Sequence, residues 1–133
     1  ILDIGCGAGG YLVNRLTAMG KRVFGFDRLL DAPSESLSFG DWLDFDYLPN
    51  TWGTIFANMS FSNHYTYQLT QQTDSVERYR KVYCKICRSL LIGGSFYYAP
   101  VLPEAELLEG DGCFKIERVE PSNMAAAVVT RLT

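Results

Sequence analysis

Apolar and polar positions alternate along the chain in short blocks, and the blocks follow a repeated strand–helix order. Apolar blocks predict strands at residues 1–4, 22–26, 36–39, 54–58, 95–99, 114–119 and 125–132. Helical spacing of apolar side chains predicts helices at residues 10–19 and 75–91, the second capped by Asp74 and ended by Gly93 and Gly94. Residues 28–35 allow at most one helical turn, residues 43–50 are turn-like, and residues 61–72 predict a loop with a short helix.

Strands that alternate with helices are typical of an α/β sheet with helices on both faces. The last two predicted strands are joined only by residues 120–123, which favours an antiparallel hairpin because parallel strands need a long crossover. The chain has 133 residues, of which 47% are hydrophobic, so we expect one domain spanning residues 1–133 with a sizeable core. It begins without Met inside a predicted strand, an arrangement compatible with missing upstream residues.

Charge and cysteine usage narrow the class of protein. The net charge is −3 and no segment is strongly basic, so a nucleic-acid partner is not indicated. Four scattered cysteines suit a reducing, cytoplasmic location better than a disulfide framework. No apolar run reaches the roughly 18 residues of a membrane span. Cys84 and Cys87 form a lone pair within a predicted helix, where core packing explains them better than metal binding, so no metal site is expected.

The first ten residues, Ile-Leu-Asp-Ile-Gly-Cys-Gly-Ala-Gly-Gly, lead from a strand through a glycine-rich turn into a helix. Glycines let such a turn approach a ligand closely, and the free N–H groups at the helix start favour an anion. Asp27 ends the second predicted strand about 20 residues later, a spacing also typical of dinucleotide-binding domains. From these two features alone, a nicotinamide cofactor stays open.

Four segments together resemble the class I S-adenosylmethionine-dependent methyltransferases. They are Leu2–Gly9, Phe24–Asp27, Phe39–Trp42 and Cys87–Phe96, and the resemblance covers nearly the whole chain. It implies a Rossmann-like, seven-stranded, mostly parallel sheet with an antiparallel C-terminal hairpin. It also implies S-adenosyl-L-methionine as cofactor and methyl transfer to an unidentified small or medium acceptor, with a small-molecule substrate as partner.

The resemblance implies which residues bind the cofactor. They are Asp3, Gly5, Cys6, Gly7, Gly9, Asp27, Arg28, Leu29, Asp41, Trp42 and Asn58. Asp27 would accept hydrogen bonds from the ribose, and Asp41 from the adenine amine. Other interpretations stay open for three of them: Asp3 can simply cap local backbone N–H groups, and Trp42 and Leu29 can be plain core residues.

Candidate catalytic residues follow the fourth predicted strand. His64 is the only histidine of the chain and is the candidate general base, if the acceptor needs one. Asn58, at the strand end, is the candidate contact to cofactor or substrate. A lone histidine in a polar segment can equally be an ordinary surface residue.

Some features depart from the family pattern. The link after Asp27 is short, Gly53-Thr54 stands where many members carry an acidic residue, and the N-terminal helices that usually wall the substrate pocket are absent. These departures favour one alternative function, a non-catalytic cofactor-binding or scaffold domain that needs a partner. An NAD-binding Rossmann domain is the other alternative. The oligomeric state is left open.

Overall fold

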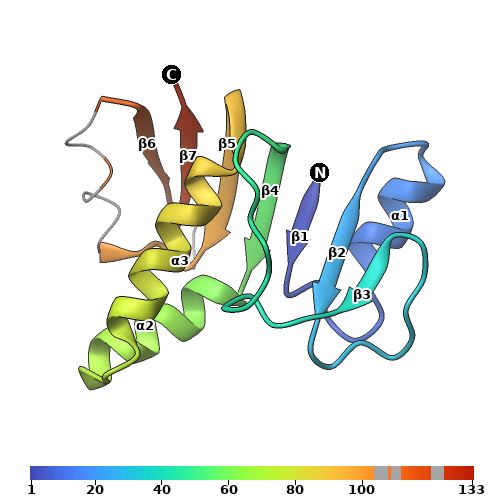
Figure 1. The fold of residues 1–133 in the computed structure, drawn as a ribbon, viewed down its shortest axis with the longest axis horizontal. Coiled ribbons are helices and arrows are strands. Elements are labelled where there is room, and N and C mark those ends of the chain that lie inside the picture. Colours follow the sequence, from blue (N-terminus) through green and yellow to red (C-terminus); the bar gives the residue numbers. More distant parts are fainter. Residues whose placement is uncertain (104–107, 109–111, 121–124) are drawn as a thin grey trace.

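In a computed structural model, which describes residues 1–103, 108, 112–120 and 125–133, a seven-stranded sheet runs through the domain (Figure 1). The strands lie in the order β3-β2-β1-β4-β5-β7-β6. Their bounds are β1 Leu2–Ile4, β2 Phe24–Asp27, β3 Leu37–Phe39, β4 Trp52–Asn58, β5 Leu90–Ala99, β6 Phe114–Val119 and β7 Ala126–Arg131.

The first five strands pair in parallel, and β7 pairs antiparallel with both β5 and β6. This confirms the predicted Rossmann-like sheet and its antiparallel C-terminal hairpin. The residues that join β6 to β7 lie partly outside the described residues. Because β1 to β4 are parallel, the segments that follow them meet at one edge of the sheet, where ligands bind in open α/β sheets.

Three helices flank this sheet: α1 Tyr11–Ala18, α2 Phe61–Gln71 and α3 Val76–Arg88. Figure 1 shows α2 and α3 in front of the strands, while α1 lies beside β2. Val13 of α1 packs in a small apolar cluster with Val23, Leu30 and Leu37. The larger core lies on the opposite face, between the sheet and α2 and α3. Helices therefore cover both faces, as predicted.

Aromatic side chains fill the core beneath α2 and α3. Tyr65 of α2 stacks on Tyr79 of α3 with ring centroids 5.5 Å apart. Tyr83 follows one turn later and shares a hydrogen bond with Tyr98 of β5, with 3.1 Å between the hydroxyl oxygens. Burial raises the pKa of both tyrosines, so the pair stays neutral and acts in packing.

The prediction of a loop with a short helix over residues 61–72 was wrong. Residues 61–71 form one continuous helix, α2. Its periodicity is weak because only Phe61, Ser62 and Tyr65 are buried, so most of the helix faces solvent. Tertiary packing of the two aromatic rings against α3 stabilises a helix whose sequence is mostly polar.

The predicted limits of α3 were also wrong. The helix ends at Arg88 rather than Leu91, and its N-terminal flanking residue is Ser75, with no side-chain cap from Asp74. Gly93 and Gly94 do not end it; they lie inside β5, beside a register irregularity opposite β4. Glycine is required there because a Cβ on Gly94 would lie 2.9 Å from the backbone oxygen of Gly53.

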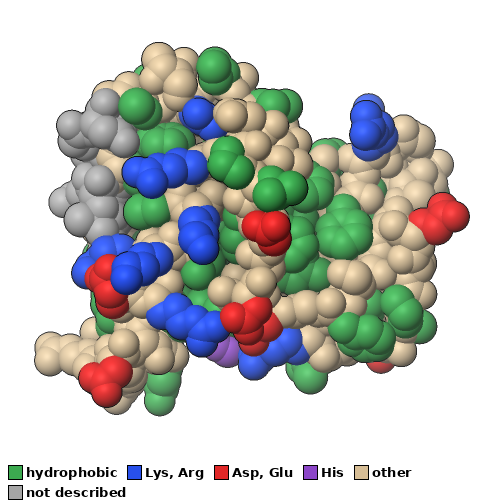
Figure 2. All heavy atoms as spheres, viewed as in Figure 1, with side chains coloured by type: hydrophobic (Ala, Val, Ile, Leu, Met, Phe, Trp, Pro, Cys, Tyr) green, Lys and Arg blue, Asp and Glu red, His purple; other side chains and the backbone are tan. Residues whose placement is uncertain are grey.

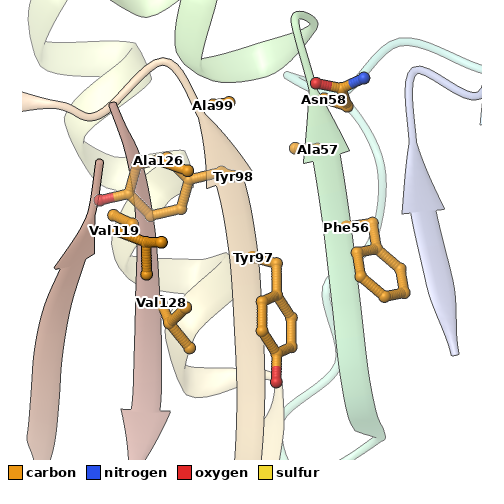
Figure 3. A pocket seen from close by; sticks show the side chains of 10 residues that line it. Phe56, Ala57, Asn58, Tyr97, Tyr98, Ala99, Val119, Ala126 and Val128 are labelled. Atoms are coloured by element: carbon orange, nitrogen blue, oxygen red, sulfur yellow. The ribbon is translucent and has the colours of Figure 1, made fainter. Parts of the chain in front are cut away.

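An apolar row crosses the sheet on the face opposite α3. Phe56, Tyr97 and Val128 lie directly opposite one another on β4, β5 and β7, and Figure 3 looks onto this face. The rings of Phe56 and Tyr97 stack 5.4 Å apart, and the row borders an apolar hollow of about 400 Å³. Within the described part of the chain, the helix on this face is α1, which packs beside β2 rather than over this row.

In the described part of the chain, no helix is both long enough and apolar enough to cross a membrane. Cys6, Cys84, Cys87 and Cys113, which all lie in the described part of the chain, form no disulfide bond with one another. Lys and Arg side chains gather over α3 in Figure 2, and several of them form ion pairs with Asp44 and Glu77. This pattern fits a solvated helix face.

Candidate cofactor and acceptor site

The glycine-rich turn after β1 is held in a shape that only glycine adopts without strain. Gly5 and Gly7 have φ values of +69° and +77°. A Cβ on Gly5 would lie 2.5 Å from the Cβ of Ser60, so the β4–α2 turn packs directly on the backbone of Gly5. No atom lies within 4 Å of the corresponding position at Gly7, where the turn is open. The turn is therefore rigid on one side and accessible on the other.

Asp27, at the end of β2, clamps this turn. One carboxylate oxygen accepts the N–H of Gly7 at 2.9 Å, and the other accepts the N–H of Leu29 at 2.8 Å. The N–H groups of Gly5 and Cys6 donate to the carbonyl of Phe26, which ties the ends of β1 and β2 together. Each carboxylate oxygen keeps a lone pair, so Asp27 can also accept hydrogen bonds from a diol.

Asp3 lies buried on β1, directly beside the turn. Burial and, second, the negative charge of Asp27 raise the pKa of the Asp3 carboxyl to about 6. A buried carboxylate next to another carboxylate is a favourable place for a cation. The pKa of Cys6 is raised to about 11, mainly by burial, and its side chain lies against the α1 side of Gly25. Cys6 can therefore offer a ligand its backbone, not a thiolate.

Asp41 and Trp42 follow β3 at the same edge. One oxygen of Asp41 accepts the N–H of Leu43 at 2.9 Å, and the other lies 3.6 Å from the guanidinium of Arg28. The Trp42 side chain is inward: the residue is only 7% exposed and its ring touches the position of a Gly5 Cβ at 3.3 Å. The ring is therefore buried like a core residue and also lies against the glycine turn, while its contact with adenine stays a prediction.

The two residues after Asp27 differ in their contacts: the side chain of Arg28 lies over an aromatic ring, and that of Leu29 is exposed to solvent. Arg28 extends over Trp42, with its guanidinium carbon 5.3 Å from the ring centroid. Leu29 is 78% exposed, so it is not a core residue and stands free beside Asp27. An exposed leucine at this point can form an apolar wall for a planar ligand.

Asn58 ends β4 and leads into α2 through a strained turn. Its side chain lies at the tip of the strand (Figure 3), and Met59 after it has a φ of +53°, which is unfavourable for a side chain of this kind. Ser60 donates a hydrogen bond from Oγ to the carbonyl of Ile4 at 2.6 Å. This bond fixes the start of α2 to the end of β1.

His64 lies in the first turn of α2, not in a loop. It is exposed and borders an open hollow of about 410 Å³ with Asn63, Tyr67 and Gln68. In Figure 2 the histidine, the only one in the chain, lies among charged side chains at the lower edge. Its ring is 4.9 Å from that of Trp42. Tyr65, the next residue, is fully buried in the core and cannot reach a substrate.

Two contributors to this site were missed by sequence reasoning. Tyr47 donates a buried hydrogen bond to the carbonyl of Trp42 at 3.1 Å, and Phe45 stacks on Phe26 of β2 at 4.3 Å. Both lie in a segment interpreted only as an acidic turn. The signal that could have found them is the aromatic pair spaced two residues apart between acidic residues. In the described residues, no group of three His, Cys, Asp or Glu side chains is placed to hold a metal ion.

Comparison with known proteins shows the fold. No family model matches the sequence, and no curated protein does. A TehB-like S-adenosylmethionine-dependent methyltransferase from Corynebacterium glutamicum is 19% identical and matches with a TM-score of 0.63, covering 98% of this chain and 78% of that one. An S-adenosylmethionine-dependent methyltransferase from Methanosarcina mazei is 14% identical, with a TM-score of 0.61 and coverage of 98% and 91%. The chain has the class I methyltransferase fold.

A third similar structure is a complex. It contains the Haloferax volcanii Trm112 methyltransferase activator and a methyltransferase, matches with a TM-score of 0.59 at 16% identity, and covers 99% of this chain and 82% of that chain. In the methyltransferase fold of this chain, the residues predicted to bind a cofactor come together: the glycine turn, Asp3, Asp27, Arg28, Leu29, Asp41 and Trp42 follow or belong to β1, β2 and β3. Asn58 and His64 lie on the adjacent β4–α2 segment.

Proposed function

We propose that the domain is an S-adenosylmethionine-dependent methyltransferase. The observation that carries the proposal is the double role of Asp27, which holds the glycine turn through Gly7 and still presents lone pairs at the sheet edge. A cofactor that bears a ribose and an amino-acid arm fits beside such a clamp. The methyltransferase fold supports this choice over a nicotinamide cofactor.

Different residues would bind different groups of the cofactor. The N–H groups of the turn that are not already donated to Phe26 and Asp27, together with those at the start of α1, would bind the carboxylate of the methionine arm, helped by the helix dipole. Asp3 faces its ammonium group, Asp27 the ribose diol, and Asp41 the exocyclic amine of adenine. Leu29 supplies an apolar wall. When bound, the cofactor supplies an electrophilic methyl group on a cationic sulfonium.

The acceptor side is formed by Asn58 and His64. Direct displacement depends mainly on alignment and exclusion of water, so these side chains first have to orient the acceptor. When the acceptor carries a proton on its nucleophilic atom, the His64 imidazole is the base that takes it. We propose a small or medium acceptor, because the hollow at His64 is about 410 Å³. A cytoplasmic location is part of the proposal and is supported by the four free cysteines.

Calorimetric titration with S-adenosylhomocysteine tests the cofactor. Asp27→Ala removes both the clamp and the ribose acceptor, and we expect it to weaken binding more than about tenfold, a change of about 1.4 kcal/mol or more. Asp74→Ala is the matched control, since it removes the same charge from an exposed position before α3. A folded wild-type sample that shows no binding at high micromolar ligand would contradict the proposal.

Transfer itself is tested with a methyl-labelled cofactor and cell extract, read by mass spectrometry. We expect a labelled small molecule with the wild type and a strongly reduced rate with His64→Gln. If His64→Gln transfers at the wild-type rate, His64 is not the base. The labelled product also identifies the acceptor.

A second candidate function is a cofactor-binding domain that acts only with a partner protein. The apolar row of Phe56, Tyr97 and Val128 favours it, since such rows are usually covered. Cofactor binding without transfer to any extract component, followed by transfer when a partner is added, would establish it.

A further inference from the structure

Three side chains from three different elements form a chain of contacts at the site, which we call the stack. Trp42, after β3, lies in the middle; Arg28, after β2, lies over its ring at 5.3 Å, and His64 of α2 contacts the ring at 4.9 Å with an interplanar angle of 56°. The stack therefore begins on the cofactor side and ends at the hollow proposed for the acceptor.

The backbone of Trp42, in the middle of this stack, is held in place, whereas the side chains of Arg28 and His64 at its ends are exposed. The Trp42 backbone is held by the buried hydrogen bond from Tyr47, and its ring lies against Gly5. The Arg28 side chain is 54% exposed and His64 is also exposed, so both can move. Both contact the same indole ring, so a coupling between the two ends would pass through this ring rather than through the backbone.

Arg28 also lies beside the Asp41 oxygen to which the adenine amine would donate. Its guanidinium lies 3.6 Å from one oxygen of Asp41, while the other oxygen of Asp41 accepts the N–H of Leu43. At 3.6 Å the guanidinium forms an ion pair without a hydrogen bond, so an adenine amine that donates to this oxygen can take the place of Arg28 beside Asp41. The ion pair and the cation–π contact of this half-exposed guanidinium are both weak interactions, so a bound ligand can displace the guanidinium.

We propose that the stack couples the two halves of the site: adenine binding at Asp41 releases Arg28 from the Trp42 ring, and the ring then sets the orientation of His64. This inference rests on the proposed cofactor. It makes Trp42 a positioning residue for His64, with no contact of its own to the reacting atoms. His64 is thereby oriented for the acceptor when the cofactor is already in place.

The single histidine makes the coupling directly measurable. In a nuclear magnetic resonance titration with S-adenosylhomocysteine, the imidazole C–H signals need no assignment among histidines, and the amide signals of Gly7 and Leu29 report binding at Asp27. We expect the His64 signals of the wild type to shift in parallel with those amides. The indole ring current makes the imidazole sensitive to sub-ångström changes at a 4.9 Å separation.

Variants separate the coupling from binding. With Trp42→Leu, which removes the ring, we expect the His64 response to fall to less than about a third while the Leu29 amide still reports binding. Trp42→Phe keeps an aromatic ring and should retain at least about half of the response. Trp52→Phe alters the other tryptophan, at the far end of β4 from Asn58, and should leave the response unchanged.

Arg28→Met tests the other end and leaves the buried ring in place, so it serves if Trp42→Leu does not fold. Without ligand, we expect its His64 signals to lie near the ligand-bound position of the wild type, because the guanidinium is already gone. Amide shifts without any His64 shift, an unchanged response in Trp42→Leu, or unchanged free signals in Arg28→Met would each overturn the coupling alone. A ligand that moves neither the amides nor His64 would overturn the proposed cofactor and the coupling with it.

Discussion

Backbone groups and clamped carboxylates form the proposed cofactor side of the site, at the ends of β1 to β3, whereas exposed side chains form the proposed acceptor side on α2. On the cofactor side, Asp27 holds two backbone N–H groups and leaves Gly7 open to a ligand. On the acceptor side, His64 and Tyr67 border an open hollow. The proposed cofactor side has its groups in place before any ligand binds. On the proposed acceptor side, the orientation of His64 depends on its contact with Trp42.

This difference follows from what each side has to recognise. A cofactor always presents the same groups, so rigid N–H donors and carboxylates can be built for it in advance. An acceptor differs between enzymes of one fold, and surface helices and loops can vary without disturbing the core. A substitution on one side can therefore be compared with one elsewhere for its effect on ligand affinity and on the free energy of unfolding.

The largest effect on ligand binding is expected on the proposed cofactor side, at Gly5. Gly5→Val places a branched side chain at a φ of +69° and 2.5 Å from Ser60 Cβ, and should lower the free energy of unfolding by about 3 kcal/mol and abolish measurable cofactor binding. Gly53→Ala is the matched control, since a Cβ there meets no atom within 4 Å. Denaturant unfolding and calorimetry measure the two effects, and a Gly5→Val protein with wild-type affinity would show that the turn is not rigid.

A smaller effect, on stability alone, is expected far from both sides. Arg131 of β7 donates from one nitrogen to Asn50 Oδ1 and to the carbonyls of Arg88 and Leu90, each at 2.8 Å. Arg131→Met removes these three hydrogen bonds, of which only the one to Leu90 is partly buried, and should cost about 0.5–1.5 kcal/mol of unfolding free energy.

Cofactor affinity should stay within about twofold for Arg131→Met, because distant sites act independently. Lys21→Met, at an exposed position after α1, controls for loss of a positive charge. A strong loss of affinity in Arg131→Met would mean that the sheet and the site are coupled more tightly than their contacts indicate.

The buried carboxyl of Asp3 predicts a pH dependence of the cofactor side. Its pKa of about 6 means that the ammonium of the ligand meets a carboxylate above pH 6 and a neutral acid below it. From pH 7 to pH 5 the affinity for S-adenosylhomocysteine should fall about tenfold, and Asp3→Asn should flatten this dependence. A profile that is equally steep in Asp3→Asn would assign the effect to another group.

Stability of the ligand-free protein should change in the opposite direction. Because the folded state raises the pKa of Asp3 from 3.8 to about 6, it binds the proton more tightly than the unfolded chain does. The cost of burying this charge is absent below pH 3.8, grows as the pH rises and is complete above pH 6. Asp3→Asn should therefore stabilise the ligand-free protein at pH 7 but not at pH 4, as measured by denaturant unfolding.

The contrast between the two sides also explains what could be predicted from the sequence. The alternation of strands and helices and the C-terminal hairpin follow from short-range patterns of apolar strands and turns, whereas the grouping of Asp3, Asp27 and Asp41 is what the family resemblance implies. Such patterns are local, so a single sequence carries them.

The acceptor side and the limits of the helices depend on long-range packing. Helix α2 exists because Tyr65 packs on Tyr79, a contact that its polar sequence does not indicate. The interior position of Trp42 and its contact with His64 require knowing that β3 and α2 meet at the same edge. Gly93 and Gly94 resemble a helix stop in sequence, yet they serve the close approach of β5 to β4.

The smallest effect is expected on the apolar row. Tyr97 and Tyr98 are neighbours in β5, and their side chains lie on opposite faces of the sheet. Tyr97 is 42% exposed on the row, and Tyr98 is 2% exposed beneath α3. Tyr97→Ser should cost less than about 1 kcal/mol, whereas Tyr98→Ser should cost about 3–5 kcal/mol because it opens a cavity and leaves Tyr83 without its partner. Denaturant unfolding compares the two directly. If Tyr97→Ser costs as much as Tyr98→Ser, or if it converts an associated protein into a monomer in sedimentation, the row is covered in solution and the partner-dependent function gains its first support.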